Sequence, residues 1–195
     1  LWVVAGPNGS GKTTLTRRHL SERLPVVNPD DIAQDLAGKA GRLEDAALRA
    51  GRSAILRQRS LLAGGESFAV ETTFSGRHEI ELMKTAKAAG YKVNLVFIGI
   101  SSPAISIARV KARQASGGHQ VPSADVTRRY FRSLNNVPQG IAVADRAWLL
   151  DNSHRRLRLV ASLERGAVKR LASTLPRWVR AAKLAVLEQG QGLSF

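Results

Sequence analysis

The chain has 195 residues, 44% of them hydrophobic, which is enough for one domain with a buried core. Its 30 Lys and Arg outnumber 15 Asp and Glu, and the net charge of +15 favours polyanionic partners: nucleotides, nucleic acid, an acidic protein or an anionic membrane surface. The sequence contains no cysteine, which excludes disulfide bonds and cysteine-based zinc sites within it.

Short apolar runs alternate with longer amphipathic segments along most of the chain. In chain order they predict a strand at 1–5, a helix at 12–23, a strand at 25–28, helices at 30–37 and 43–63, a strand at 67–71, a helix at 77–89, a strand at 92–100, helices at 103–116 and 123–136, and a strand at 146–151. Nearly continuous apolar strands separated by helices are typical of a parallel sheet covered on both faces. We therefore predict a three-layer α/β fold with a central parallel sheet of about five strands.

A glycine-rich loop, GPNGSGKT at residues 6–13, joins the first predicted strand to the first predicted helix. Its glycines let backbone N–H groups wrap a phosphate, and the helix N-terminus then faces the anion. In this pattern Lys12 reaches the β- and γ-phosphates, and the Thr13 hydroxyl is a ligand of Mg²⁺. The motif in this context predicts a P-loop NTPase or kinase fold. The predicted nucleotide-binding residues are Gly6, Pro7, Asn8, Gly9, Ser10, Gly11, Lys12, Thr13 and Thr14.

Two aspartates follow the second predicted strand, in PDDIA at residues 29–33. Open parallel sheets bind ligands at the carboxyl ends of their strands, so Asp30 or Asp31 can accept the proton of an attacking hydroxyl there. Either aspartate can instead cap the following helix and offset its dipole. The residues alone leave both interpretations open.

The third predicted strand ends in polar residues, in FAVETTFSG at 68–76. Glu71 can hold the magnesium shell in the manner of a Walker B acid, while Thr73 and its neighbours supply hydroxyls at the same edge of the sheet. The alternative is a polar strand end followed by a helix cap.

The helices predicted at 103–116 and 123–136 carry several arginines on either side of SGGHQVP. Arg109 and Arg113 are four residues apart and so share a helix face, and Arg128 and Arg129 follow on the second helix. Two helices with a glycine-rich break suit a lid over a triphosphate, about residues 105–135, whose guanidinium groups stabilise charge on the transferred group. The alternative is an exposed pair of basic helices.

The C-terminal segment, residues 154–195, is basic and poor in strand patterns. A spacing of four between Leu163, Ala167, Leu171 and Leu175 favours a helical stretch from Glu164 that breaks near Pro176. We expect a kinase core at 1–153 and, at 154–195, a basic helical extension packed on that core. Its basic face is either solvated or a surface for an acidic partner.

Six motifs within residues 1–153 resemble, in order, the zeta toxin family of P-loop kinases, in its short zeta-like branch. They are GPNGSGKTT, VVNPDDIA, VETTFSG, AGYKVNLVFIGI, RVKARQASGGHQVP and LLDNS. The family comprises the toxins of bacterial toxin–antitoxin pairs, which phosphorylate UDP-N-acetylglucosamine with ATP or GTP. The resemblance implies the same fold and the same class of reaction.

The resemblance also implies roles for individual residues. It assigns Lys12 and Thr13 to ATP and Mg²⁺, Asp30 to activation of the acceptor hydroxyl, and Glu71 with Thr73 to the strand end that contacts substrate. Arg109 falls at the family's first lid arginine. His119 stands where the family has its second lid arginine, and Arg113, Arg128 or Arg129 can substitute for it.

We therefore expect an ATP- or GTP-dependent kinase that transfers the γ-phosphate to a hydroxyl of a nucleotide sugar such as UDP-N-acetylglucosamine. The expected catalytic residues are Asp30, Lys12, Arg109 and Arg113; the expected substrate-binding residues are Glu71, Thr73, His119 and Arg128; the expected magnesium ligands are Thr13 and Glu71.

The expected partners are the nucleotide-sugar substrate and, for a toxin, an acidic antitoxin. A polynucleotide or tRNA kinase of the same fold and a non-enzymatic nucleotide-dependent switch are the alternatives. Nucleic acid is less favoured, because aromatic residues make up only 5% of the chain and no aromatic–basic stacking surface is visible. The longest apolar run, residues 95–100, is too short to span a bilayer, so we expect a cytoplasmic protein.

Overall fold

The computed structural model describes residues 1–37, 43–115, 121–184 and 187. Its strands are β1 (Trp2–Ala5), β2 (Val26–Val27), β3 (Ala69–Thr72), β4 (Asn94–Gly99), β5 (Arg146–Asp151), β6 (Arg158–Glu164) and β7 (Ala167–Leu171). Its helices are α1 (Lys12–His19), α2 (Pro29–Ala37), α3 (Leu43–Ala63), α4 (His78–Ala88), α5 (Pro103–Ala115), α6 (Ser123–Val143) and α7 (Arg177–Ala181).

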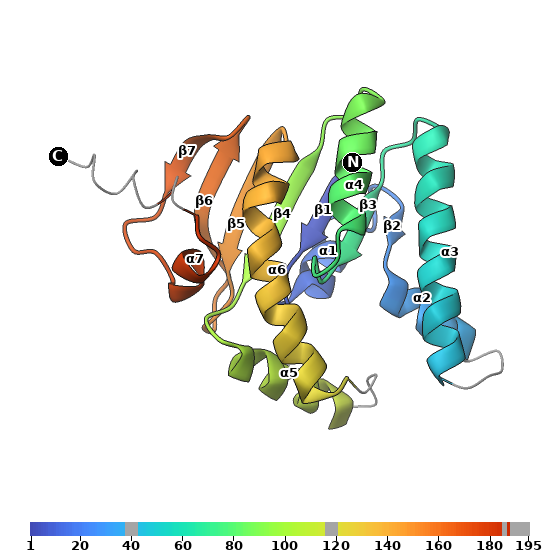
Figure 1. Cartoon of the computed structure of the whole chain (residues 1–195), viewed down its shortest axis with the longest axis horizontal. Coiled ribbons are helices and arrows are strands. Elements are labelled where there is room, and N and C mark those ends of the chain that lie inside the picture. Colours follow the sequence, from blue (N-terminus) through green and yellow to red (C-terminus); the bar gives the residue numbers. More distant parts are fainter. Residues whose placement is uncertain (38–42, 116–120, 185–186, 188–195) are drawn as a thin grey trace.

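The strands form one sheet in the order β2-β3-β1-β4-β5-β6-β7. The first five of these are parallel to one another, while β6 is antiparallel to β5 and β7 is antiparallel to β6. The α/β prediction and the parallel sheet of about five strands are therefore confirmed. Figure 1 shows α4 and α6 in front of the sheet and α1 behind it.

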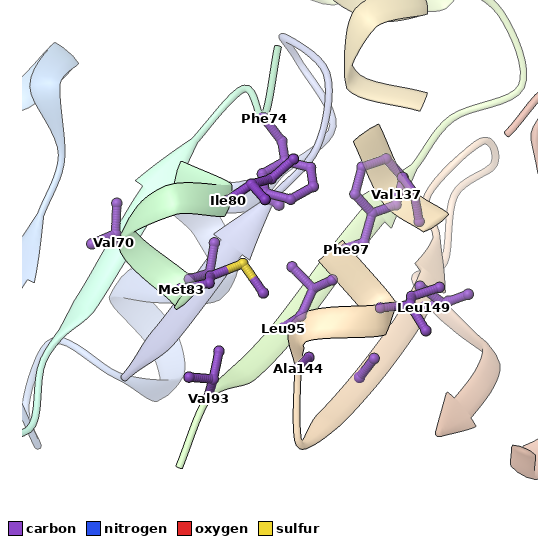
Figure 2. Close-up of a cluster of buried hydrophobic side chains, with 14 of the residues drawn as sticks. Val70, Phe74, Ile80, Met83, Val93, Leu95, Phe97, Val137, Ala144 and Leu149 are labelled. Carbon is purple, nitrogen blue, oxygen red and sulfur yellow. The ribbon is translucent and has the colours of Figure 1, made fainter. Parts of the chain in front are cut away.

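The main core fills the space between the sheet and the helices α4 and α6. Figure 2 shows Leu95 and Phe97 of β4 beside Met83 of α4 and Val137 of α6, all of them fully buried. Helix α6 extends beyond the predicted end at residue 136, through Pro138, because its buried face continues to Ile141. Among the described residues, no helix is long and apolar enough to cross a membrane.

The prediction of a helix from Glu164 onwards is wrong, because this part of the chain forms the hairpin of β6 and β7. Glu164 pairs with Ala167, so Arg165 and Gly166 make a two-residue turn, and both have positive φ, at 49° and 79°. Such turns match the twist of antiparallel strands, and β5 supplies a neighbour for the hairpin. A spacing of four residues had suggested a helix, but only Leu163 of that set is fully buried in the described structure.

Helix α7, which follows Pro176, is packed on the sheet through Trp178. This side chain is fully buried, and its indole N–H donates to Oδ1 of the buried Asp151 at the end of β5, at 3.1 Å. The N-terminal end of this short helix therefore contacts the carboxyl end of β5. The loops of the candidate site lie at the same edge of the sheet.

Candidate active site

The loop between β1 and α1 has the backbone geometry that holds phosphates. Gly6 has a φ of 146°, and a Cβ there would lie 2.3 Å from the carbonyl oxygen of Ile98, so only glycine fits. Gly11 is the N-cap of α1 in the left-handed conformation, at φ 98°. The loop therefore leads directly into the N-terminus of α1, whose free N–H groups suit an anion.

Lys12 is the first residue of α1 and is buried. Its Nζ donates to the carbonyl oxygen of Pro7 at 3.0 Å, across the loop. Burial lowers the pKa of Lys12, the charges of Glu71 and Asp30 raise it in part, and Arg113 lowers it further. A bound anion would offset the burial of this ammonium group.

Glu71 in β3 binds two hydroxyls of α1 with its two carboxylate oxygens. Thr13 Oγ1 donates to Oε1 at 2.5 Å, and Thr16 Oγ1 lies 2.8 Å from Oε2. Thr16 also lies 2.6 Å from the carbonyl oxygen of Lys12, so it shares one hydrogen between two acceptors. The strand end and the P-loop helix are thus joined at the position predicted for magnesium.

The two aspartates of α2 have different surroundings. Asn28 caps the helix, because its Oδ1 accepts the backbone N–H of Asp30 at 3.0 Å. The Asp30 side chain therefore has no capping role and lines the cleft. Asp31 lies 3.7 Å from Arg17 in an exposed ion pair and is not among the residues that line the cleft.

Basic side chains reach the cleft from α5 and α6. Arg109, Arg113 and Arg129 line it, and Arg109 Nη1 donates to the carbonyl oxygen of Gly9 at 3.2 Å. Arg128 does not line the cleft and instead pairs with Asp125 at 2.9 Å. Arg129, and not the predicted substrate-binding residue Arg128, thus lines the cleft, because consecutive residues of a helix point about 100° apart.

His119 and the glycines of the predicted lid break lie in residues 116–120, outside the described part of the chain. Most of the other predicted residues converge on one cleft of about 540 Å³, but Gly6, Pro7, Ser10 and Arg128 do not line it. It is lined by Asn8, Gly9, Gly11, Lys12, Thr13, Thr14, Asn28, Pro29, Asp30, Glu71, Thr72, Thr73, Ser75, Glu79, Arg109, Arg113 and Arg129.

Several residues of the site were not predicted from the sequence. Asn152, after β5, donates from Nδ2 to the carbonyl oxygen of Ser10 at 2.8 Å, and the Ser106 hydroxyl donates to the carbonyl oxygen of Asn8. Asn152 belongs to the motif LLDNS at residues 149–153, from which its place at the site could have been predicted. Glu79 lines the cleft from the first turn of α4, and no local pattern marks it.

The oxygen atoms at the P-loop suit Mg²⁺. The Thr13 hydroxyl and the Glu71 carboxylate are hard oxygen donors at hydrogen-bond distance from each other. No group of three or more His, Cys, Asp or Glu side chains in the described ranges forms a metal cage. Mg²⁺ in phosphotransfer sites is usually held by one or two carboxylates together with phosphate oxygens.

Comparison with protein families and curated proteins gives two matches. A family model described as an AAA domain matches residues 1–134. An uncharacterised protein of Haemophilus influenzae (strain ATCC 51907 / DSM 11121 / KW20 / Rd) is 39% identical over 137 residues, which are 67% of this chain and 96% of the relative. The residues matched by the family model include the P-loop, the β3 strand end and the arginines of α5 and α6.

Two solved structures share the fold at low sequence identity. The AvrRxo1-ORF1:-ORF2 complex crystallised with ATP matches with a TM-score of 0.69 and 18% identity over 95% of this chain. The chain spans only 62% of that protein's length. A structure of the PezAT chromosomal toxin–antitoxin system of Streptococcus pneumoniae matches with a TM-score of 0.59 and 16% identity, over 83% of this chain and 71% of that one.

Proposed function

We propose that this chain, which belongs to the AAA domain family, is a kinase that transfers the γ-phosphate of ATP to a hydroxyl of a small acceptor. One observation supports this most directly: a single cleft joins a P-loop lysine, three carboxylates (Asp30, Glu71 and Glu79) and three arginines. A P-loop that only bound nucleotide would not need the carboxylate of Asp30 together with the arginines of the same cleft.

The proposed reaction uses these residues in separate roles. The acceptor oxygen attacks the γ-phosphorus while the bond from that phosphorus to the β,γ-bridging oxygen breaks, and ADP leaves. Asp30 takes the proton of the acceptor hydroxyl. Lys12, Arg109 and Arg113 stabilise the charge on the phosphate oxygens, which is the main source of catalysis in such sites.

Magnesium, when held by Thr13 and Glu71, would neutralise phosphate charge in this reaction. The chain prepares this position by itself, because Thr16 and Thr13 orient the two oxygens of Glu71. The AvrRxo1-ORF1:-ORF2 complex with ATP supports a nucleotide in the same fold.

For the acceptor we propose a nucleotide sugar, with UDP-N-acetylglucosamine as the first candidate, on the resemblance to the zeta toxin family. Thr73, Ser75 and Glu79 offer hydroxyl and carboxylate groups to sugar hydroxyls, and Arg129 offers a cation to a diphosphate. The structural likeness to a toxin–antitoxin system supports a toxin role with an acidic protein as the neutralising partner.

The test is a transfer assay with γ-labelled ATP and Mg²⁺, in which UDP-N-acetylglucosamine and a tRNA or oligonucleotide are offered in parallel. We expect a labelled nucleotide-sugar product, and none with Lys12→Ala. Label on the nucleic acid alone would instead identify a polynucleotide kinase, which the net charge of +15 favours. ATP binding without transfer to any acceptor in a metabolite extract would identify a nucleotide-dependent switch.

A further inference from the structure

The loop after β3 presents Thr73 and Ser75 to the cleft, and their hydroxyls lie 3.0 Å apart. Between them Phe74 has a φ of 57°, a left-handed conformation that a bulky side chain rarely adopts. Its backbone N–H donates to Thr72 Oγ1 at 2.9 Å. Such a backbone persists only where surrounding contacts hold it in place.

Asn136 of α6 supplies two of those contacts. Its side-chain amide nitrogen donates to the carbonyl oxygens of Phe74 and Gly76, both at 2.9 Å. Both hydrogens of this NH₂ group are therefore used, and the two carbonyls bracket Ser75. Asn136 is 62 residues from Phe74 in the chain, so this contact depends on the packing of α6 against the end of β3.

The Phe74 ring is held by the same helix. It is fully buried among the core side chains drawn in Figure 2. It contacts α6 at Gly140, where a Cβ would lie 2.8 Å from Phe74 Cζ. Asn136 and Gly140 are four residues apart on one face of α6. This face therefore contacts both the backbone carbonyls of the loop and the ring of Phe74.

Helix α6 also carries a cation of the cleft. Arg129 precedes Asn136 by seven positions, which is about two helical turns and places both on the same side. The helix therefore links the loop that presents Thr73 and Ser75 to an arginine at the same cleft.

We infer that Asn136 is a positioning residue for the acceptor, which holds the Thr73–Ser75 loop in its binding conformation without contacting the acceptor. This inference rests on the proposed kinase function. It assigns to Asn136 an effect on the acceptor alone, since its two side-chain hydrogen bonds go to the loop after β3 and not to the P-loop. Small displacements of positioning groups reduce rates strongly, because transfer needs near-ideal alignment.

The test compares Asn136→Asp with Asn135→Asp. Asn135 is the exposed neighbour on the same helix, so the control makes the same chemical change without touching the loop. Asp has nearly the shape of Asn but lacks N–H donors at neutral pH. With UDP-N-acetylglucosamine as the probe, we expect Asn136→Asp to lower kcat/KM for the acceptor about 10- to 100-fold, with KM for ATP changed less than about twofold.

Amide hydrogen exchange gives a second readout that needs no acceptor. We expect faster exchange in a peptide covering residues 72–77 in Asn136→Asp, with unchanged exchange in the P-loop peptide. If the wild-type protein phosphorylates no acceptor while this exchange difference is present, the kinase proposal fails and the positioning contact stands. Equal losses for ATP and acceptor, the same effect in Asn135→Asp, or unchanged exchange at 72–77 would each overturn the inference.

Discussion

Thr16 Oγ1 of α1 lies 2.8 Å from Glu71 Oε2 of β3, and it is buried from solvent. The other oxygen of the same carboxylate accepts the hydroxyl of Thr13. One hydrogen-bonded unit thus joins Thr13, the residue after the P-loop lysine, to Glu71, which lies almost 60 positions later in β3. The geometry of the proposed magnesium site depends on this unit as well as on the P-loop.

Glu71→Gln should weaken the binding of Mg²⁺ more than the binding of nucleotide. The amide has one oxygen acceptor in place of two and carries no charge, so Thr13 and Thr16 lose a common anionic partner. We expect the Mg²⁺ concentration for half-maximal activity to rise about tenfold or more. Titration of the transfer assay with Mg²⁺ measures this.

Thr16→Val provides a matched comparison for the same unit, since valine is also β-branched and has a methyl group in place of the hydroxyl. A smaller shift in the same direction is expected, because Glu71 keeps its charge and loses one contact. An unchanged Mg²⁺ dependence in Glu71→Gln would remove this residue from the metal site.

Asp30→Asn should lower turnover roughly 10²- to 10⁴-fold while ATP affinity is retained, as expected for a general base. Asp30 lines the cleft, whereas the neighbouring Asp31 pairs with Arg17 at the surface. Asp31→Asn is therefore the control and should leave turnover within about twofold, since exposed ion pairs contribute little. Single-turnover kinetics together with ATP titration separate the two effects. A reversed order of the two variants would place the base at Asp31.

Arg129→Ala should lower turnover by about 10²-fold if its guanidinium stabilises the transferring group or a substrate diphosphate. Arg128→Ala is its control, because the Arg128 side chain pairs with Asp125 and does not line the cleft. This substitution removes the same charge from the same helix. Steady-state assays of both variants at one ionic strength measure the difference. Equal losses would indicate a general effect of positive charge and not a contact at the site.

Asp145→Asn should destabilise the protein by about 1 kcal/mol at neutral pH. Asp145 Oδ2 accepts the backbone N–H of Val93 at 2.8 Å, and Oδ1 lies 3.2 Å from Lys87 Nζ. The hydrogen bond from Val93 lowers the pKa of Asp145 below its ordinary value, against an opposing effect of burial, and Lys87 lowers it further.

The sign of the pH dependence follows from that lowered pKa. The folded state binds the Asp145 proton less tightly than the unfolded state, so the stabilisation is complete above the unfolded pKa near 3.8. It is lost as the pH falls through the lower folded pKa. Urea denaturation should therefore show a difference between wild type and Asp145→Asn at pH 7 that shrinks below pH 3.8. Asp35→Asn, at an exposed position of α2, serves as the control.

Features that depend on residues close together in the chain could be predicted from the amino-acid sequence. The spacing of GPNGSGKT between an apolar strand and a helix predicts the P-loop, because phosphate binding there uses consecutive backbone N–H groups. The apolar runs of β1, β3, β4 and β5 predict a buried parallel sheet for the same local reason. The hairpin of β6 and β7 was not predicted, because apolar side chains at a spacing of four residues favour a helix over the same segment. The hairpin also depends on pairing with β5, which is a contact that local sequence does not specify.

Which polar residues face the cleft could not be predicted from the sequence, because it depends on how distant segments pack together. Asp30 and Asp31, or Arg128 and Arg129, are equivalent by composition, but one step along a helix turns a side chain by about 100° and separates the cleft from the surface. The contact of Asn136 with the Phe74 and Gly76 carbonyls joins segments about 60 residues apart. Such contacts form only when the packing of α6 on the sheet sets the distance between the two segments, which no local pattern specifies.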